Sequence, residues 1–242
     1  MAGQINIGDT WKNISAMNIN IGDTWKSVVA AQVNIGDSWK TWWPTTAPID
    51  GKYIYLYNST GTTLKSDDYG ASFNNGGTVT AYYSDIACDG TGKYVLCDQA
   101  APVKVSSNYG ASYSHVTVTG GYAGMWVNRN GSVMVCGGST GNIRVSLTSG
   151  TTWSVLDLPG TVAYYGVCGN LNGDIQYYSG GDTTIGGIYK SLDYGASYST
   201  LLSGITNLRM CCCSGDGSYV TVAKNGGYLY VSNNSGQTFS TK

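Results

Sequence analysis

The chain has 242 residues, with 13 basic and 14 acidic side chains and a formal net charge of -1 at pH 7. This balance provides no basic field for nucleic acid and no acidic field, so we expect no nucleic-acid partner. The 35 Gly, 4 Pro and 20 Tyr, without a long amphipathic helical pattern, predict an all-β fold. No stretch reaches the ~18 apolar residues of a membrane span, so we expect no membrane insertion.

An eight-residue pattern occurs three times near the start of the chain. Its Ile-Asn-Ile or Val-Asn-Ile start alternates like a half-buried strand, Gly-Asp follows as a turn, and Trp-Lys resumes an extended segment. Each copy therefore predicts a short β-hairpin. The copies recur every 14 residues and are Ile5–Lys12, Ile19–Lys26 and Val33–Lys40.

Residues 1–44 contain no cysteine and are too few to bury much surface on their own. We therefore expect their indoles to pack together, against the rest of the chain, or against another subunit. Two interpretations stay open, a small internal core and an attachment or oligomerisation module. The aromatic residues with this assembly role are Trp11, Trp25, Trp39, Trp42 and Trp43, the last two lying in an extended connector before Pro44.

A different pattern, Ser-x-Asp/Asn/Thr-x-Gly-x-Ser/Thr-aromatic, occurs five times in the remainder of the chain. Its first serines are separated by 40, 40, 45 and 41 residues, a spacing typical of repeated supersecondary units. The Gly supplies a positive φ, and the Asp or Asn accepts hydrogen bonds from amides of its own turn. The structural positions are Ser66, Asp68, Gly70, Ser106, Asn108, Gly110, Ser146, Thr148, Gly150, Ser191, Asp193, Gly195, Ser232, Asn234 and Gly236.

Each repeat predicts four short strands, and the last repeat shows them most clearly. There the expected strands are 208–213, 219–223, 228–232 and 238–240. The fourth repeat is longer by five residues near 180–187, which predicts an extended surface hairpin. The first repeat is less regular, and its first strand is expected from the connector. The third turn departs from the frame at Thr148 and Ser149, so we expect it to be less well capped.

The five-fold frame resembles the Asp-box, or BNR, repeat of sialidases, which joins the third and fourth strands of a β-propeller blade in that family. The resemblance implies a five-bladed Asp-box β-propeller over residues 45–242, preceded by the small three-repeat β-hairpin module over residues 1–44. The N-terminal copies look like the tandem Asn-Ile-Gly-x-x-Trp-Lys repeats of predicted tailed-phage virion proteins.

Residues for catalysis or metal binding are poorly represented. Sialidases of this family need three arginines on a substrate carboxylate and a Tyr-Glu pair, whereas this chain has no Glu. Its arginines, Arg129, Arg144 and Arg209, lie at non-equivalent places of the repeat. The single histidine, His115, is expected to be an ordinary strand residue. We therefore expect no enzyme, no catalytic residue, no metal site and no cofactor.

The seven cysteines are odd in number, and Cys211–Cys213 are consecutive, which does not fit a disulfide framework. We expect structural thiols, with Cys88, Cys136, Cys168 and part of Cys211–Cys213 near the start of each blade. Residues 1–4 lack the charged start of a secretion signal, so we expect synthesis in a reducing host cytoplasm.

Binding is better supported by the composition than catalysis. Tyr69, Tyr109 and Tyr194 occupy the same place in three of the turns, where they can form a rim of similar surface contacts. Packing is the alternative explanation for each of them.

These observations give a first functional hypothesis, a non-enzymatic structural protein of the bacteriophage virion (tail, fibre or head decoration). Its N-terminal repeats would attach it to other virion proteins or to itself as a homo-oligomer, and its propeller would be displayed for host-surface glycan. The alternatives are a stand-alone lectin-like carbohydrate-binding propeller and, less favoured, a glycosidase.

Overall fold

The computed structural model is all-β, and no helix occurs in the part of the chain that it describes. Accordingly, nothing in that part is a helix of the length and apolarity needed to cross a membrane. Contacts divide the chain into two compact units, residues 1–48 and 49–242. The described residues are 4–7, 10–13, 18–21, 24–27, 32–35, 38–41, 51–57, 62–78, 85–97, 103–116, 122–138, 141–160, 162–182 and 185–242.

The first unit contains three antiparallel two-stranded hairpins. The strands are β1 (Gln4–Ile7), β2 (Thr10–Asn13), β3 (Asn18–Ile21), β4 (Thr24–Ser27), β5 (Gln32–Ile35) and β6 (Ser38–Thr41). All three hairpins share one register, in which each tryptophan pairs with the central asparagine: Asn6 with Trp11, Asn20 with Trp25 and Asn34 with Trp39. Trp42 and Trp43 lie outside the described residues.

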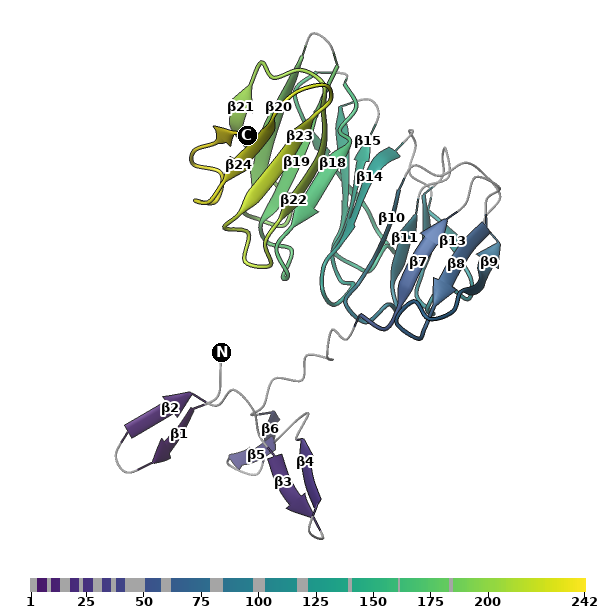
Figure 1. The fold of residues 1–242 in the computed structure, drawn as a ribbon, viewed down its shortest axis with the longest axis vertical. Helices are drawn as coiled ribbons and strands as arrows, with labels where there is room; N and C mark the ends of the chain where they lie inside the picture. Colours follow the sequence, from purple (N-terminus) through teal and green to yellow (C-terminus); the bar gives the residue numbers. More distant parts are fainter. Residues whose placement is uncertain are drawn as a thin grey trace. The chain divides into compact units, whose positions relative to one another are not determined.

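The second unit is a series of antiparallel sheets, each built from strands that follow one another along the chain (Figure 1). The first sheet has β7 (Ile54–Tyr57), β8 (Thr62–Ser66) and β9 (Asn74–Thr78). The second has β10 (Ile86–Cys88), β11 (Val95–Cys97), β12 (Lys104–Ser106) and β13 (Ser114–His115). The third has β14 (Tyr122–Val127), β15 (Met134–Gly138), β16 (Asn142–Ser146) and β17 (Ser154–Asp157).

The fourth sheet has β18 (Gly166–Gly169), β19 (Gln176–Gly181), β20 (Gly186–Ser191) and β21 (Ser199–Ser203). The fifth has β22 (Leu208–Cys213), β23 (Val220–Lys224), β24 (Leu229–Ser232) and β25 (Ser240–Thr241). The fifth sheet thus carries strands close to those expected from the sequence. The extra strand expected for the first sheet falls on residues 42–50, which lie outside the described residues.

A shared register makes positions in the five sheets directly comparable. The first serine of each repeat ends the strand before the turn and pairs with one residue of the preceding strand. The pairs are Ile54–Ser66, Val95–Ser106, Met134–Ser146, Gln176–Ser191 and Val220–Ser232. Counting from these pairs identifies equivalent residues in every sheet.

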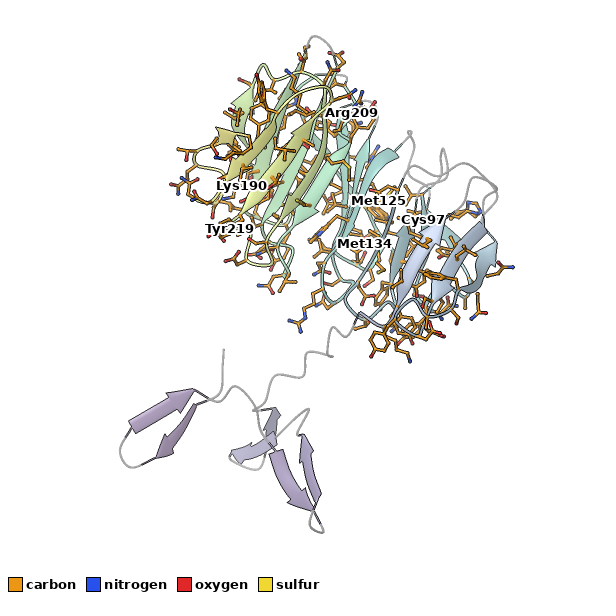
Figure 2. The ribbon with its side chains drawn as sticks, viewed as in Figure 1. Cys97, Met125, Met134, Lys190, Arg209 and Tyr219 are labelled. Carbon is orange, nitrogen blue, oxygen red and sulfur yellow. The ribbon has the colours of Figure 1, made fainter. Side chains whose placement is uncertain are left out.

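The apolar core lies between consecutive sheets, because each sheet has a forward face turned to the next sheet and a rear face turned to the previous one. Leu96 and Val105 of the second sheet pack against Met125 and Met134 of the third, the two methionines labelled in Figure 2. Ile188 of the fourth sheet packs against the fifth sheet in the same way. Alternation along each strand separates the two faces.

Hydrogen bonds reinforce this succession at one edge of the sheets. The N–H of Gly90 donates to the Arg129 carbonyl at 2.9 Å, Arg129 donates to Leu171 at 3.2 Å, and Leu171 donates to Gly215 at 2.8 Å. These four residues belong to the first turns of the second, third, fourth and fifth sheets. The ladder therefore runs from each sheet to the next.

The series does not close on itself within the described residues. Strand contacts join β7 to β10, β10 and β11 to β14, β14 and β15 to β18, and β18 and β19 to β22. No comparable packing joins a described strand of the first sheet to one of the fifth, and Figure 1 places these sheets at opposite ends of the unit.

One expectation about the cysteines is corrected. Cys136 lies in β15, the second strand of its sheet, and not near the start; Cys88 and Cys168 do lie in first strands. The extra residues of the fourth repeat lengthen β19 and β20 up to the Gly181–Gly186 pair. Gly181 at the base of this hairpin is buried and donates its N–H to the Ala163 carbonyl at 3.1 Å, whereas Asp182 and Ile185 beyond it are exposed, as expected for an extended surface hairpin.

Candidate binding surface

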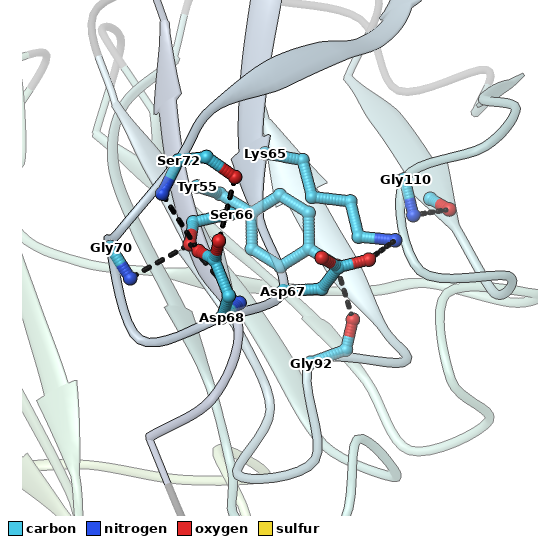
Figure 3. A network of polar contacts seen from close by, with 10 residues as sticks. Tyr55, Lys65, Ser66, Asp67, Asp68, Gly70, Ser72, Gly92 and Gly110 are labelled. Carbon is cyan, nitrogen blue, oxygen red and sulfur yellow. Dashed lines mark hydrogen bonds and ion pairs between the residues drawn. The ribbon is translucent and has the colours of Figure 1, made fainter.

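The first of the repeated turns, residues 66–73, closes through its own side chains (Figure 3). The Ser66 hydroxyl donates to Asp68 at 2.7 Å and accepts the N–H of Gly70 at 2.8 Å. Asp68 accepts the N–H of Ser72 at 2.9 Å and its hydroxyl at 2.6 Å. Hydrogen bonds from Ser72 and Ser66 hold the pKa of the Asp68 carboxyl at about 2, below its ordinary 3.8.

The same two backbone bonds recur in the other four turns. The N–H of the Gly reaches the first serine at 2.9 Å in each of them, for Gly110, Gly150, Gly195 and Gly236. The N–H four residues after the Asp, Asn or Thr reaches its side-chain oxygen at 2.8–3.0 Å. Each turn follows the strand that ends at the first serine and leads into the last strand of its sheet. Their polar residues are therefore used to stabilise local structure.

The third turn, with Thr148, differs from the others in one bond. The Ser146 and Thr148 hydroxyls are 3.4 Å apart, whereas the equivalent distances elsewhere are 2.7–2.9 Å. The Thr152 N–H still reaches the Thr148 hydroxyl oxygen at 2.8 Å. The weaker cap expected from the sequence is therefore confined to the contact between the two side chains.

The sequence did not reveal that two residues of each turn have a positive φ. The residue before the Gly is also left-handed, with φ between 52° and 62° at Tyr69, Tyr109, Ser149, Tyr194 and Ser235. These residues donate their N–H to a backbone carbonyl just before the strand that pairs with the one ending at the first serine, as Tyr69 does to Lys52, which precedes β7, at 3.2 Å. The tertiary bond supports a conformation that costs energy for a residue with a Cβ.

Tyr69, Tyr109 and Tyr194 lie at equivalent places and are 64%, 37% and 42% exposed. Tyr109 also packs in a small aromatic contact, with its ring 5.0 Å from that of Tyr53 and the Lys65 ammonium 5.8 Å from its centroid. The three tyrosines belong to turns of the first, second and fourth sheets, and the third and fifth turns have Ser149 and Ser235 at this place. An uninterrupted tyrosine rim is therefore not formed.

A groove of about 810 Å³ lies between the outer strands of the second sheet and the third turn. Trp153 lines it, and its indole N–H donates to the Gly150 carbonyl at 2.9 Å, which fixes the ring. Exposed His115, from β13 of the second sheet, also lines the groove. The lining residues are Tyr94, Val105, Ser107, Ser114, His115, Val116, Thr148, Ser149, Gly150, Thr151 and Trp153.

A smaller groove of about 290 Å³ occupies the equivalent place one sheet earlier, between strands β8 and β9 and the second turn. Lys65, Asp67 and Tyr109 line it, and Figure 3 shows the Lys65 ammonium beside Asp67 at 3.9 Å. Both grooves combine aromatic and hydrogen-bonding side chains, as sugar and peptide sites do. The sequence marked the third turn as unusual, but the contribution of His115 from another sheet required the structure.

The arginines considered for a glycosidase do not come from equivalent positions. Arg129 lies in the turn after β14, Arg144 in β16 and Arg209 in β22. The Arg209 guanidinium stacks on the Tyr165 ring at 4.3 Å from its centroid, and Figure 2 locates Arg209 near one end of its strand. A packing partner therefore accounts for the position of this side chain.

The thiols are free at all seven cysteines, and Cys97, Cys136 and Cys168 are buried. Within the described part of the chain, no group of three His, Cys, Asp or Glu side chains is arranged to hold a metal ion. Several aspartates instead support turns, as Asp89 does by accepting the N–H of Tyr94 at 2.8 Å.

The fold is similar to that of β-propeller-like proteins of known structure. A chain of hydrazine synthase from Kuenenia stuttgartiensis matches with a TM-score of 0.65 over 80% of this chain and 63% of that one. A chain of a nidogen/laminin complex matches with 0.60 over 79% and 76%, and YCF48 bound to a D1 peptide with 0.56 over 79% and 63%. Identity is 13% in each case, so the likeness concerns the fold alone.

No known protein family and no curated protein sequence matches the chain.

Proposed function

We propose that this protein is a non-enzymatic structural component of a bacteriophage virion, made in the host cytoplasm. Residues 1–44 attach it to the particle or to further copies of itself. Residues 45–242 form a five-bladed Asp-box β-propeller that is displayed for binding. The five equivalent turns support the Asp-box assignment. In each of them the glycine N–H donates to the first serine, and a later backbone N–H donates to the side chain of the Asp, Asn or Thr.

The observation that carries the proposal is the repeated register of the first unit. Three hairpins of four residue pairs each present tryptophan at one fixed place, and they belong to a unit distinct from the five sheets. Small hairpins with the same register and the same tryptophan position offer similar contacts, so a symmetric partner can engage them together. A module of this kind suits attachment better than catalysis.

The mass in solution of the full chain and of a variant starting at Thr45 tests the proposal. We expect the full chain to be an oligomer. We expect the truncated protein to remain folded and to contain fewer copies of the chain. Replacing Trp11, Trp25 and Trp39 by Ala should mimic the truncation. If the three replacements leave both the mass and co-purification with phage particles unchanged, residues 1–44 are not an attachment module.

A second candidate function is carbohydrate binding in the groove beside Trp153. The groove provides an aromatic ring, an exposed imidazole and several hydroxyls, which suit a sugar with an apolar face and polar edges. This reading is the lectin-like alternative, and it is compatible with display on a virion.

Glycan-array binding followed by calorimetry tests this second function. We expect His115→Ala to lower the affinity for a glycan that the wild-type protein binds. We expect Thr151→Tyr to block the groove and so to prevent binding. Leu192→Ala serves as the control, because Leu192 is 65% exposed in a different turn. Equal affinity of all four proteins for the glycan would mean that the groove beside Trp153 is not its binding site.

A further inference from the structure

The forward face of the fifth sheet is apolar, and no described strand of the chain covers it. In β22, Cys211 packs against the fourth sheet, so its neighbours on the strand point to the opposite face. In β23 and β24, Val222 and Tyr230 also pack against the fourth sheet. The forward face therefore consists of Met210, Cys212, Thr221, Ala223, Leu229 and Val231.

The equivalent forward faces of other sheets are fully covered by the next sheet. The place of Leu229 is occupied by Ile143 in the third sheet and Ile188 in the fourth, and both are 0% exposed. Leu229 itself is 45% exposed and Met210 is 71% exposed. The fifth sheet thus keeps apolar residues at positions that are covered wherever another sheet follows.

The rear face of the first sheet shows the complementary exposure. Its residues are Ile54 and Leu56 of β7 and Leu64 of β8, and Leu56 pairs directly with Leu64. Leu56 is 45% exposed, whereas its equivalents in the second to fifth sheets are 0% exposed: Cys97, Cys136, Tyr178 and Val222. Among the described residues, no sheet covers this face of the first sheet as one does in the other four.

We propose that the forward face of the fifth sheet binds the rear face of the first sheet of a second copy of this chain. Every sheet-to-sheet contact in the unit joins a forward face to a rear face, and these two faces are the pair left over. The first sheet of the same chain lies at the other end of the series, so it does not serve as the occupant in this structure. The association is head-to-tail.

A head-to-tail contact uses two different surfaces, so each copy retains one free face after the first contact. Copies then close into a ring or continue as a filament, depending on the rotation between them. This inference is independent of residues 1–44 and of the proposed virion function.

Sedimentation velocity of the full chain over a wide concentration range tests the proposal. We expect concentration-dependent association by the wild-type protein. Leu229→Asp blocks the fifth-sheet face and Leu56→Asp blocks the first-sheet face, and each should weaken self-association about 30-fold or more. The matched control is Leu192→Asp, an exposed leucine on neither face, which should associate like wild type.

Mixing the two variants gives the decisive result. An equimolar mixture of the Leu229→Asp and Leu56→Asp proteins keeps one intact pair of faces, so it should regain one-to-one pairing through these faces, beyond any association through residues 1–44 that each variant shows alone. A symmetric interface would give no such rescue and would overturn the proposal. Association that neither variant changes would assign it to residues 1–48 and would also overturn the proposal.

The same proteins also test whether the two faces are covered within a single chain. If wild type is monomeric at all concentrations and both variants lower its thermal midpoint, the faces are covered within one chain and the proposal is wrong. Met210→Lys, at a 71% exposed position, repeats the test should Leu229→Asp fail to fold.

Discussion

The fourth and fifth sheets have the same four-strand order and register, yet their forward faces meet different surroundings. Ile188 and Tyr177 of the fourth sheet are 0% exposed beneath the fifth sheet, whereas Leu229 at the place of Ile188 is 45% exposed. Thr221 stands at the place of Tyr177 and is only partly buried. Strand order and the turn contacts are thus repeated, while burial depends on whether another sheet follows.

This difference separates two sources of stability. The turns and strand pairs of each repeat are made within about 40 residues of chain and recur in both sheets. The apolar core forms between consecutive sheets. Burial of the forward face of the fifth sheet therefore requires a partner other than the sheets of this series. Substitutions at equivalent positions of the two sheets can measure the two contributions separately.

The largest expected contrast is between Ile188→Ala and Leu229→Ala. Removing buried Ile188 leaves a cavity in the core between the fourth and fifth sheets and should cost about 2–5 kcal/mol of unfolding free energy. Leu229→Ala should stay within ~0.5 kcal/mol at concentrations where the protein is a single copy. Urea unfolding of both variants measures the difference. Similar losses in dilute protein would mean that the two faces are equally covered within one chain.

The next effect concerns two tyrosine hydroxyls that reach from one sheet to the next. Tyr177 donates to the Gly217 carbonyl at 2.8 Å, and equivalent Tyr55 donates to the Gly92 carbonyl at 2.7 Å. Tyr→Phe at either place leaves a buried carbonyl without its donor and should cost about 2 kcal/mol. Tyr194→Phe, at a 42% exposed side chain, should change stability little. An unchanged urea midpoint for Tyr177→Phe would contradict a role for this bond in joining the sheets.

A smaller effect is expected in the turns, and it should be equal in the two sheets. Ser191 and Ser232 each accept the N–H of a glycine at 2.9 Å. Ser→Ala at either position should cost about 1.5 kcal/mol, because the glycine N–H loses its acceptor and the Asp193 or Asn234 side chain loses its hydroxyl donor, while the other bonds of the turn remain. Urea unfolding again measures it. A much larger loss at Ser191 than at Ser232 would show that the turns also depend on the following sheet.

The sequence predicted the features that are local. The turn at 66–73 is closed by residues within eight positions of one another, so its spacing could be read without tertiary information. The fifth-sheet strands were found for the same reason, since alternation and turn glycines mark them. The sequence alone therefore identifies turn residues such as Ser232 and Gly236.

The features that were missed depend on residues far apart in sequence. His115 and Trp153 line one groove although they come from different sheets, and nothing in either segment indicates the other. The alternation around Leu229 matches that around Ile188 and so predicts a core residue. Leu229 is exposed because its sheet is the last of the series. A repeat pattern predicts that sheets stack but not what covers the last one.

The smallest expected effect exchanges the capping residues of the two sheets. Asp193 caps the fourth turn and Asn234 the fifth, each by accepting an amide N–H at 2.9–3.0 Å. Hydrogen bonds from Ser197 and Ser191 lower the pKa of the Asp193 carboxyl below its ordinary 3.8.

A carboxyl with a lowered pKa in the folded state binds protons more readily once unfolded. Its stabilising contribution is therefore complete above its ordinary pKa and is lost as the pH falls through the lowered value. Asp68 behaves in the same way, with a pKa of about 2, so the loss at that turn falls between pH 3.8 and about 2. Asp193→Asn should flatten the acid side of the stability profile, and Asn234→Asp should steepen it. Thermal midpoints of both variants from neutral pH down to this window test the exchange; parallel profiles would mean that the carboxyl is solvated equally before and after folding.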